Sequence, residues 1–407
     1  MRYDVFFGFS QVAVDGRIPS EDLMFENLCS QVRLADRLGF HTAWFGSAHL
    51  SLAEQQRGPN PRLPHFRGEM CLNTDILQLA HLLFPQTRRI HLGSAVHNLL
   101  CNGGPVAQAE ATRTFLTLHR HRPSRDRLLY LGLGTGRFEF VNAVYGVRPR
   151  SPLEEVAWAP LRGLILAEAL EIFLRLVQGE AISSEDVEPK RLRREHFRSD
   201  LHWQQTREAA NQADADAIEI SPFWTFEKLR IIPKEADLDN LRVVLGTHDP
   251  QVQTYANRFF PCQVFNLSVT SPEVIDATHE RMRTCFHSAG GPWHRSYMPR
   301  TVMVFVDAGP GGATARQERA YDRAQRALRT YWHAMEGTID EEKVTHGVRN
   351  AVHGDPEQVA NQLRARFHPD DALMLWFDFA DHDTHRVEDA MTAFWEQVVP
   401  RLDEPDA

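Results

Sequence analysis

The chain has 407 residues, of which 43% are hydrophobic and 24% charged, so it is a globular protein with ample material for a large core. A net charge of −9 argues against nucleic acid as the main partner. The five cysteines are widely spaced, and neither a disulfide framework nor a zinc knuckle fits them. The N-terminus lacks a signal-peptide core, and no apolar run approaches the ~18 residues of a membrane span. We therefore expect a cytoplasmic protein with no membrane partner.

Short apolar segments alternate with amphipathic helices along the whole chain. The first strand is predicted at 3–9, and from Glu21 apolar residues recur at helical spacing until Gly39, which supplies a C-terminal stop. Later helices begin with N-terminal signals. In Asp355-Pro-Glu-Gln358, for example, Asp355 is the expected N-cap, followed by a first-turn proline and a glutamine at the third helical position. The other predicted strands are 42–46, 90–96, 128–133, 241–246, 263–268, 301–306 and 373–378.

Eight strands, each followed by a helix, form the pattern of a (β/α)8 TIM barrel, an α/β fold. A doubly wound sheet is the alternative, but it needs a glycine-rich loop after its first strand. Here the first strand ends in Phe9-Ser10-Gln11. We predict that residues 1–407 form one barrel domain with an insertion at about 179–240, between strands four and five. A structureless loop of that length is unusual, so the insertion should have some structure of its own.

The active site of a barrel lies at the C-terminal ends of its strands. The side chains predicted there are aromatic, rich in histidine and, in the first strands, poor in carboxylates. The last strand adds Asp378, Asp381 and His382, but the segment 381–383 also reads as a helix cap, and no His-x-His pair follows strand one. We predict no metal. The expected strand-end residues are Phe7, Phe9, His49, Ser94, His97, Asn98, Thr135, Arg137, Thr247 and His248.

Two segments could hold an anion. Gly132-Leu-Gly-Thr-Gly136 follows strand four and offers backbone N–H groups to a phosphate, although such turns also occur without ligands. Gly246-Thr-His248 ends strand five just before a helix whose N-terminus would face the barrel mouth. The alternative is that Thr247 or Asp249 only caps that helix.

Several further segments carry motifs that are weak alone. They gain weight because they occur together, in a fixed order along the chain. They are 34–45 (LADRLGFHTAWF), 87–96 (TRRIHLGSAV), 105–110 (PVAQAE), 131–136 (LGLGTG) with Tyr145-Gly146, and 353–360 (HGDPEQVA). Together they resemble the luciferase-like monooxygenase family of flavin-dependent barrels, over nearly the whole chain.

The resemblance implies a reduced flavin at the barrel mouth, FMNH2 delivered by a separate flavin reductase, which reacts with O2 to oxygenate a small organic substrate. It leaves two alternatives open. One is an oxidoreductase that uses the deazaflavin F420 for hydride transfer, and the other is a barrel that binds flavin without catalysis. Dimers are common in the family, so a homodimer is possible.

The same resemblance suggests roles for the strand-end residues. The flavin phosphate is expected near Gly134, Thr135, Arg137, Gly246, Thr247 and His248, with Ser94 and Asn98 against the isoalloxazine ring. The candidate substrate contacts are Phe7, Phe9 and, from the insertion, Trp224, although each aromatic residue also fits a plain core. The basic run 190–194 fits a solvated helix face better than a binding site.

The chain departs from the family in two places. After strand two the family often carries an acidic residue and two histidines, whereas this chain has Ser47-Ala48-His49, so Ala48 stands where the catalytic histidine is frequently found. His49 is then either the proton-transfer residue or structural, and we predict it as catalytic. The segment 118–127 replaces a short turn, and we expect it at the bottom of the barrel, where it would affect packing or oligomerisation.

Overall fold

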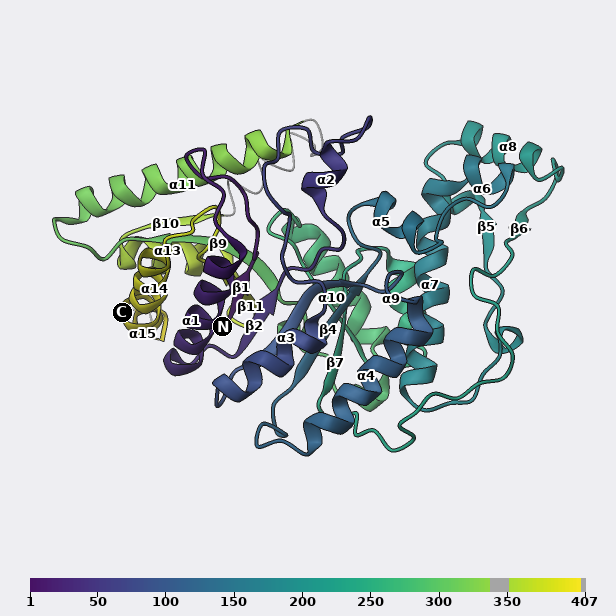
Figure 1. The fold of residues 1–407 in the computed structure, drawn as a ribbon, viewed down its shortest axis with the longest axis horizontal. Coiled ribbons are helices and arrows are strands. Elements are labelled where there is room, and N and C mark those ends of the chain that lie inside the picture. Colours follow the sequence, from purple (N-terminus) through teal and green to yellow (C-terminus); the bar gives the residue numbers. More distant parts are fainter. Residues whose placement is uncertain (337–350, 404–407) are drawn as a thin grey trace.

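Eight parallel strands curl around the centre of the protein, as the computed structural model shows for residues 1–336 and 351–403 (Figure 1). Pairing runs in order from β1 to β8 on one side and through β11 and β9 on the other. The strands are β1 (Arg2–Phe7), β2 (Thr42–Phe45), β3 (His91–Asn98), β4 (Leu129–Gly134), β7 (Leu241–Leu245), β8 (Cys262–Val264), β9 (Arg300–Val306) and β11 (Ala372–Trp376).

The ring closes between β8 and β9. Asn266, just beyond β8, forms a parallel bridge with Arg300 at the start of β9. The Asn266 N–H donates to the Pro299 carbonyl at 2.9 Å, and its own carbonyl accepts from Thr301 N–H at 3.1 Å. A short extra strand, β10 (Val352–Gly354), pairs with the end of β9. The predicted (β/α)8 barrel is therefore confirmed.

Helices cover the outside of the barrel. Their starts follow the predicted signals: the Asp355–Gln358 capping box is formed, and Gly39 ends the first helix with φ +111°. The long helices are α1 (Glu21–Leu38), α3 (Ile76–Leu83), α4 (Gly104–Arg120), α7 (Trp158–Val177), α10 (Pro272–Cys285), α11 (Ala313–Met335), α13 (Pro356–Arg366) and α14 (Thr384–Ala393). The shorter ones are α2 (Leu52–Gln56), α5 (Glu139–Val144), α6 (Pro152–Val156), α9 (Pro250–Ala256) and α15 (Val399–Asp403).

Some element ends differ from the prediction. Strand β1 stops at Phe7, because Phe9 adopts a left-handed backbone with φ +50° that cannot continue a strand. Helix α9 is short and ends at Ala256, where the Asn257 side-chain amide donates to the carbonyls of Gln253 and Cys262. The last predicted helix is divided by a π-helical turn at Phe394–Val398, between α14 and α15.

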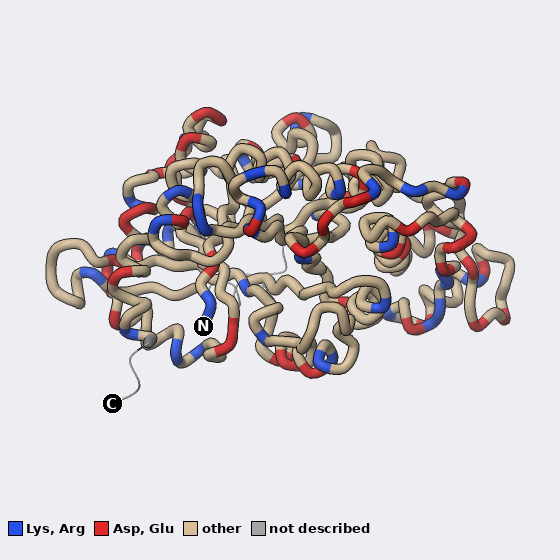
Figure 2. Tube along the Cα trace, turned by 90° about the horizontal axis from the view of Figure 1, so that it is seen from below, with Lys and Arg blue, Asp and Glu red and all other residues tan. Residues whose placement is uncertain are grey.

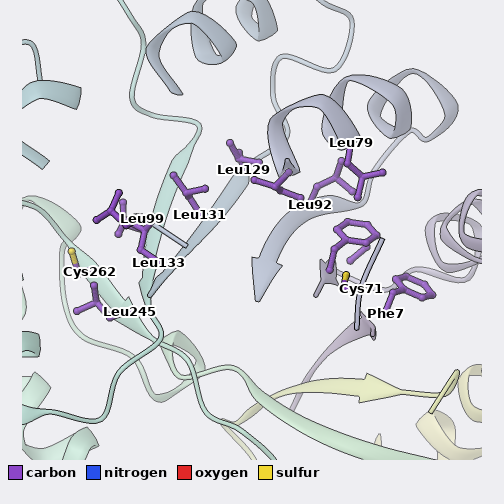
Figure 3. Close-up of a cluster of buried hydrophobic side chains, with 14 of the residues drawn as sticks. Phe7, Cys71, Leu79, Leu92, Leu99, Leu129, Leu131, Leu133, Leu245 and Cys262 are labelled. Carbon is purple, nitrogen blue, oxygen red and sulfur yellow. The ribbon is translucent and has the colours of Figure 1, made fainter. Parts of the chain in front are cut away.

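The main core lies between the barrel and its helices. Figure 3 shows side chains from neighbouring strands, such as Leu92, Leu131 and Leu245, in this layer. A second cluster fills the barrel interior. Its members are Phe6, Trp44, Tyr130, Val244 and Met374, from five different strands, and Phe265 just beyond β8, as a packed barrel requires.

The segment between α7 and β7 extends to the side of the barrel (Figure 1). It contains helix α8 (Asp200–Ala209) and the antiparallel pair β5 (Arg191–Arg193) and β6 (Ala217–Glu219). Lys190 is buried rather than solvated: its Nζ donates to Glu171 at 3.1 Å on α7 and to Tyr255 at 2.7 Å on α9. This ion pair ties the segment to the barrel. The single-domain organisation and the insertion bounds of about 179–240 stay predictions.

Acidic and basic residues intermingle along the outer helices and loops in Figure 2. No helix among the described residues is long and apolar enough to cross a membrane.

Candidate functional site

A cavity of about 590 Å³ lies at the C-terminal ends of the strands. Its volume is within the range of small-molecule and cofactor sites. The loops that follow the strands supply most of the wall, and α1 and α11 complete it with residues such as Gln31 and Tyr331. Phe6 and Phe265 of the interior cluster also line it, so the packed barrel core forms its floor. Most of its lining residues are apolar.

His49 lies in this wall, on the loop after β2. Asn73 fixes the loop, because its side chain donates to the Gly46 carbonyl at 2.9 Å and its carbonyl accepts from Ala48 N–H at 3.1 Å. The His49 Nε2 is buried and has no hydrogen-bond partner. Burial, and to a lesser extent the neighbouring His97, lowers the pKa of His49 to about 4. His49 is therefore neutral at physiological pH.

His97, at the end of β3, lies behind His49 rather than in the cavity wall. Its ring centroid is 5.9 Å from that of His49. Both of its ring nitrogens are buried without a hydrogen bond. Burial lowers the pKa of His97, and the Gln108 amide opposes this shift. The structure therefore holds two neutral imidazoles side by side.

The turn after β4 contributes to the cavity wall as predicted. Gly134, Thr135 and Arg137 line the cavity, and the Arg137 side chain is exposed. Gly136 lies between them with φ +70°, and an added Cβ would collide with the Asn98 amide. The turn thus offers backbone N–H groups and an exposed guanidinium, which lies 5.6 Å from the centre of the Phe138 ring, close to an apolar cavity.

Ser94 and Asn98, the two residues of β3 that were predicted to contact the isoalloxazine ring, lie in different environments. Asn98 lines the cavity, but its amide already bonds Asn142 at 2.8 Å and Leu100 N–H at 3.0 Å. Ser94 does not line the cavity, and its hydroxyl bonds both the N–H and the carbonyl of Gly132 on β4. Ser94 joins two strands in this structure, and its contact with a flavin stays a prediction.

The three residues after β7 that were predicted to bind the flavin phosphate also differ in position. Gly246 lines the cavity, whereas Thr247 and His248 do not. The Thr247 hydroxyl accepts from Asp249 N–H at 3.2 Å, and Asp249 caps α9. His248 Nε2 lies 3.2 Å from the Thr270 hydroxyl. The capping interpretation therefore describes Asp249 and the Thr247 side chain, and phosphate binding by Thr247 and His248 stays a prediction.

The three predicted aromatic substrate contacts lie in different places. Phe9 lines the cavity, held by edge-to-face contact with Phe25 at 4.9 Å. Phe7 points to the outer core and stacks on Phe45. Trp224 packs beside the start of α4, where its indole would lie 2.7 Å from a Cβ on Gly104. Only Phe9 therefore reaches the cavity in this structure.

Two further cavity residues lie at the end of the last strand, and neither was assigned a binding role from the sequence. Trp376 and Asp378 both line the cavity, and Asp378 is the second residue beyond the end of β11. Burial raises the pKa of Asp378 to about 7. Asp378 was considered only as a metal ligand with Asp381 and His382. In the structure Asp381 instead pairs with Arg386 at 2.6 Å. The signal in the sequence is an acid just after an apolar strand, which is also compatible with a helix cap or a metal ligand.

A comparison of the sequence with known protein families gives one match. The sequence model of the luciferase-like monooxygenase family matches residues 5–369. No curated protein matches the chain in sequence.

Solved structures share the fold over nearly the full length. The monooxygenase RslO1 from Streptomyces bottropensis has a TM-score of 0.66 at 15% identity, covering 98% of this chain and 99% of its own. The oxygenating constituent of 3,6-diketocamphane monooxygenase from Pseudomonas putida, a type II Baeyer-Villiger monooxygenase in complex with FMN, has a TM-score of 0.58 at 15% identity, covering 100% and 99%. An F420-dependent secondary alcohol dehydrogenase with an F420-acetone adduct has a TM-score of 0.56 at 13% identity, covering 99% of both chains.

Proposed function

The chain belongs to the luciferase-like monooxygenase family, and we propose that it uses reduced FMN and O2 to oxygenate a small organic substrate. The observation that carries the proposal is a mostly apolar cavity at the strand ends with the uncharged, unpaired His49 in its wall. Such a cavity excludes water from a reactive intermediate, which is what oxygen chemistry on a flavin needs.

The residues present fit an FMN. The apolar walls suit a fused aromatic ring, and the cavity volume of about 590 Å³ leaves room for a substrate beside it. The exposed guanidinium of Arg137 and the backbone of the Gly134–Gly136 turn suit a phosphate. Gly246 lines the same cavity, which supports its assignment to this end of the cofactor.

When bound, reduced FMN supplies the two electrons needed to reduce O2 and insert one oxygen atom into the substrate. The protein positions the cofactor and the substrate, excludes water from the cavity and controls proton transfer. His49, neutral at physiological pH, accepts a proton or a hydrogen bond through its unpaired Nε2. Phe9 and the other apolar wall residues hold water away from that nitrogen.

The test is O2 consumption by the purified chain with FMN, NADH, a separate flavin reductase and a panel of small organic substrates. We expect substrate-dependent oxygenated product in addition to hydrogen peroxide from free reduced flavin. No binding of FMN in either redox state would refute the proposal.

One other function has a specific observation in its favour. An F420-dependent alcohol dehydrogenase shares the fold over its whole length. Parallel titrations with FMN and F420 separate the two proposals, since each predicts tighter binding of its own cofactor. A flavin-binding barrel without catalysis, suggested by Ala48, would bind FMN but give no turnover in any variant.

A further inference from the structure

Two carboxamide side chains stand on the face of α1 that meets the cavity. Asn27 and Gln31 line the cavity beside Met24 and Leu28, and they are only 9% and 4% exposed. Residues four apart on a helix point to the same side, so the two amides lie next to each other. A buried polar side chain in an apolar wall calls for an explanation, and the chemistry proposed above uses neither amide.

The nitrogen end of each amide is bonded to the segment after β11. Asn27 Nδ2 donates to the His382 carbonyl at 3.1 Å, and Gln31 Nε2 donates to the Thr384 hydroxyl at 3.2 Å. A carbonyl can only accept, so the Asn27 amide cannot be turned around. These bonds hold α1 to that segment, and they use only the donor end of each amide.

The oxygen end of each amide is unused. No donor among the described residues bonds Asn27 Oδ1 or Gln31 Oε1, and neither atom is among the polar atoms that are fully enclosed without a partner. Both oxygens are therefore accessible, and both residues belong to the cavity wall. A carboxamide oxygen has two lone pairs and can only accept hydrogen bonds. The α1 wall therefore offers the cavity a pair of acceptors.

This wall lies across the barrel mouth from the predicted phosphate site. Helix α1 follows β1, whereas the glycine-rich turn follows β4 and Gly246 follows β7. In the ring of strands, β2, β3 and β4 separate β1 from β7 on one side, and β11, β9 and β8 separate them on the other. A flavin held by its phosphate at β4 and β7 therefore leaves the α1 wall to the substrate.

The group that fits these acceptors is an uncharged donor. The cavity wall contains two acids: Asp381 is already paired with Arg386 at 2.6 Å, and burial raises the pKa of Asp378 to about 7. Neither supplies the full, unpaired negative charge that a buried ammonium group would need. A neutral N–H or O–H group needs only the amide oxygens.

We propose that Asn27 and Gln31 bind, through their side-chain oxygens, a neutral N–H or O–H group at one end of an otherwise apolar substrate. The neighbouring apolar wall residues Phe9, Met24 and Leu28 are placed to hold its hydrocarbon part. This inference names the substrate class of the cavity and so rests on the proposed function. Its test measures binding alone and needs no turnover.

The probes are indole, benzofuran and 1-methylindole, which share a fused bicyclic shape. Only indole has an N–H group, since benzofuran carries an oxygen at that position and 1-methylindole a methylated nitrogen. We expect calorimetry on the full chain to show indole binding on the order of tenfold more tightly than the other two, because they leave the amide oxygens without a donor. The order should be the same with and without added FMN.

Variants assign the preference to the two amides. Gln31→Met keeps the length of the side chain and removes the acceptor, so the preference for indole should fall roughly threefold. Asn27→Leu should lower it by a similar factor. Gln205→Met makes the same change at an exposed position of α8 and should leave it unchanged. Because the preference is a ratio of affinities on one preparation, a smaller folded fraction in a variant cancels out.

Three results would overturn this inference: equal affinity for the three probes, no binding of any of them, or a wild-type preference in both Gln31→Met and Asn27→Leu. The last result, with a lower denaturation midpoint, is what a purely structural role of the amides predicts. FMN binding is measured on the same samples. A chain that binds FMN without preferring indole retains the proposed function and loses this inference, and a chain that prefers indole but binds no FMN does the reverse.

Discussion

The imidazole rings of His49 and His97 meet edge to face, with centroids 5.9 Å apart and planes inclined at 72°. His49 lines the cavity and His97 lies behind it. Protonation of His49 would place a charge in a poorly solvated site beside a second imidazole, which is why its pKa falls to about 4. The side chain of His49 in the cavity wall is therefore a neutral imidazole rather than an imidazolium.

Replacing His49 tests its assignment as the catalytic residue. We expect His49→Ala to lower kcat by about 10²–10⁴, the usual contribution of a positioned acid or base, while FMN affinity changes little. Product formation and FMN titration on the same preparation separate the two effects. His121→Ala, at an exposed histidine, is the control and should match the wild type. Full turnover in His49→Ala would make His49 structural.

The low pKa of His49 predicts how stability depends on pH. Its folded-state pKa of about 4 lies below its ordinary 6.5, so between these values the unfolded chain binds the extra proton. The stabilisation is complete above about pH 6.5 and is lost as the pH falls through 4. Denaturant unfolding should show that His49→Gln loses about 2 kcal/mol less than the wild type between about pH 7.5 and 5. Identical losses would contradict the assigned pKa.

Arg137 is expected to bind the flavin phosphate. Arg137→Ala should weaken FMN binding on the order of tenfold and leave riboflavin binding unchanged, because only FMN carries the phosphate. Fluorescence titration with both flavins measures this difference. Arg148→Ala removes another exposed arginine and should affect neither ligand. Equal weakening of both flavins by Arg137→Ala would show that it acts through the ring pocket.

Gly136 is required by both its backbone and its surroundings. Gly136→Ala places a side chain at φ +70° and against the Asn98 amide, which bonds Asn142 at 2.8 Å. We expect a loss of about 1–3 kcal/mol in unfolding free energy and weaker FMN binding.

A matched glycine separates the two costs. Gly146 has φ +87° but nothing within 4 Å of an added Cβ. Gly146→Ala should therefore cost only the backbone strain, about 1 kcal/mol, with FMN affinity intact. If Gly136→Ala costs no more than Gly146→Ala, the collision with Asn98 is not significant.

Periodicity and strand-end logic predicted the barrel, the wall positions of His49, Gly134 and Arg137, and the cap at Asp355. These features depend on local sequence or on the rule that parallel strands end at one face. The side-chain direction of Phe7 and the pairing of Ser94 with Gly132 depend instead on strand register and bulges. Periodicity does not give those, so residues adjacent to the cavity could not be told from residues in it.

Asp378 shows a second reason why the sequence alone could not predict the whole site. Its raised pKa arises because distant segments, including the one that carries Cys71, bury it, while the Gly8 N–H opposes the shift. The sequence shows only an acid after an apolar strand, which equally describes a helix cap or a metal ligand. Distinguishing these needs the neighbours in space, above all the Trp376 ring that lies against Gly8.

The most direct test of the central claim is an anaerobic titration of the full chain with reduced FMN, with reduced F420 in parallel. We predict saturable binding of reduced FMN at a 1:1 ratio, tighter than that of F420, and product formation when O2 and a suitable substrate are then admitted. Absence of FMN binding in both redox states, or clear preference for F420, would contradict it.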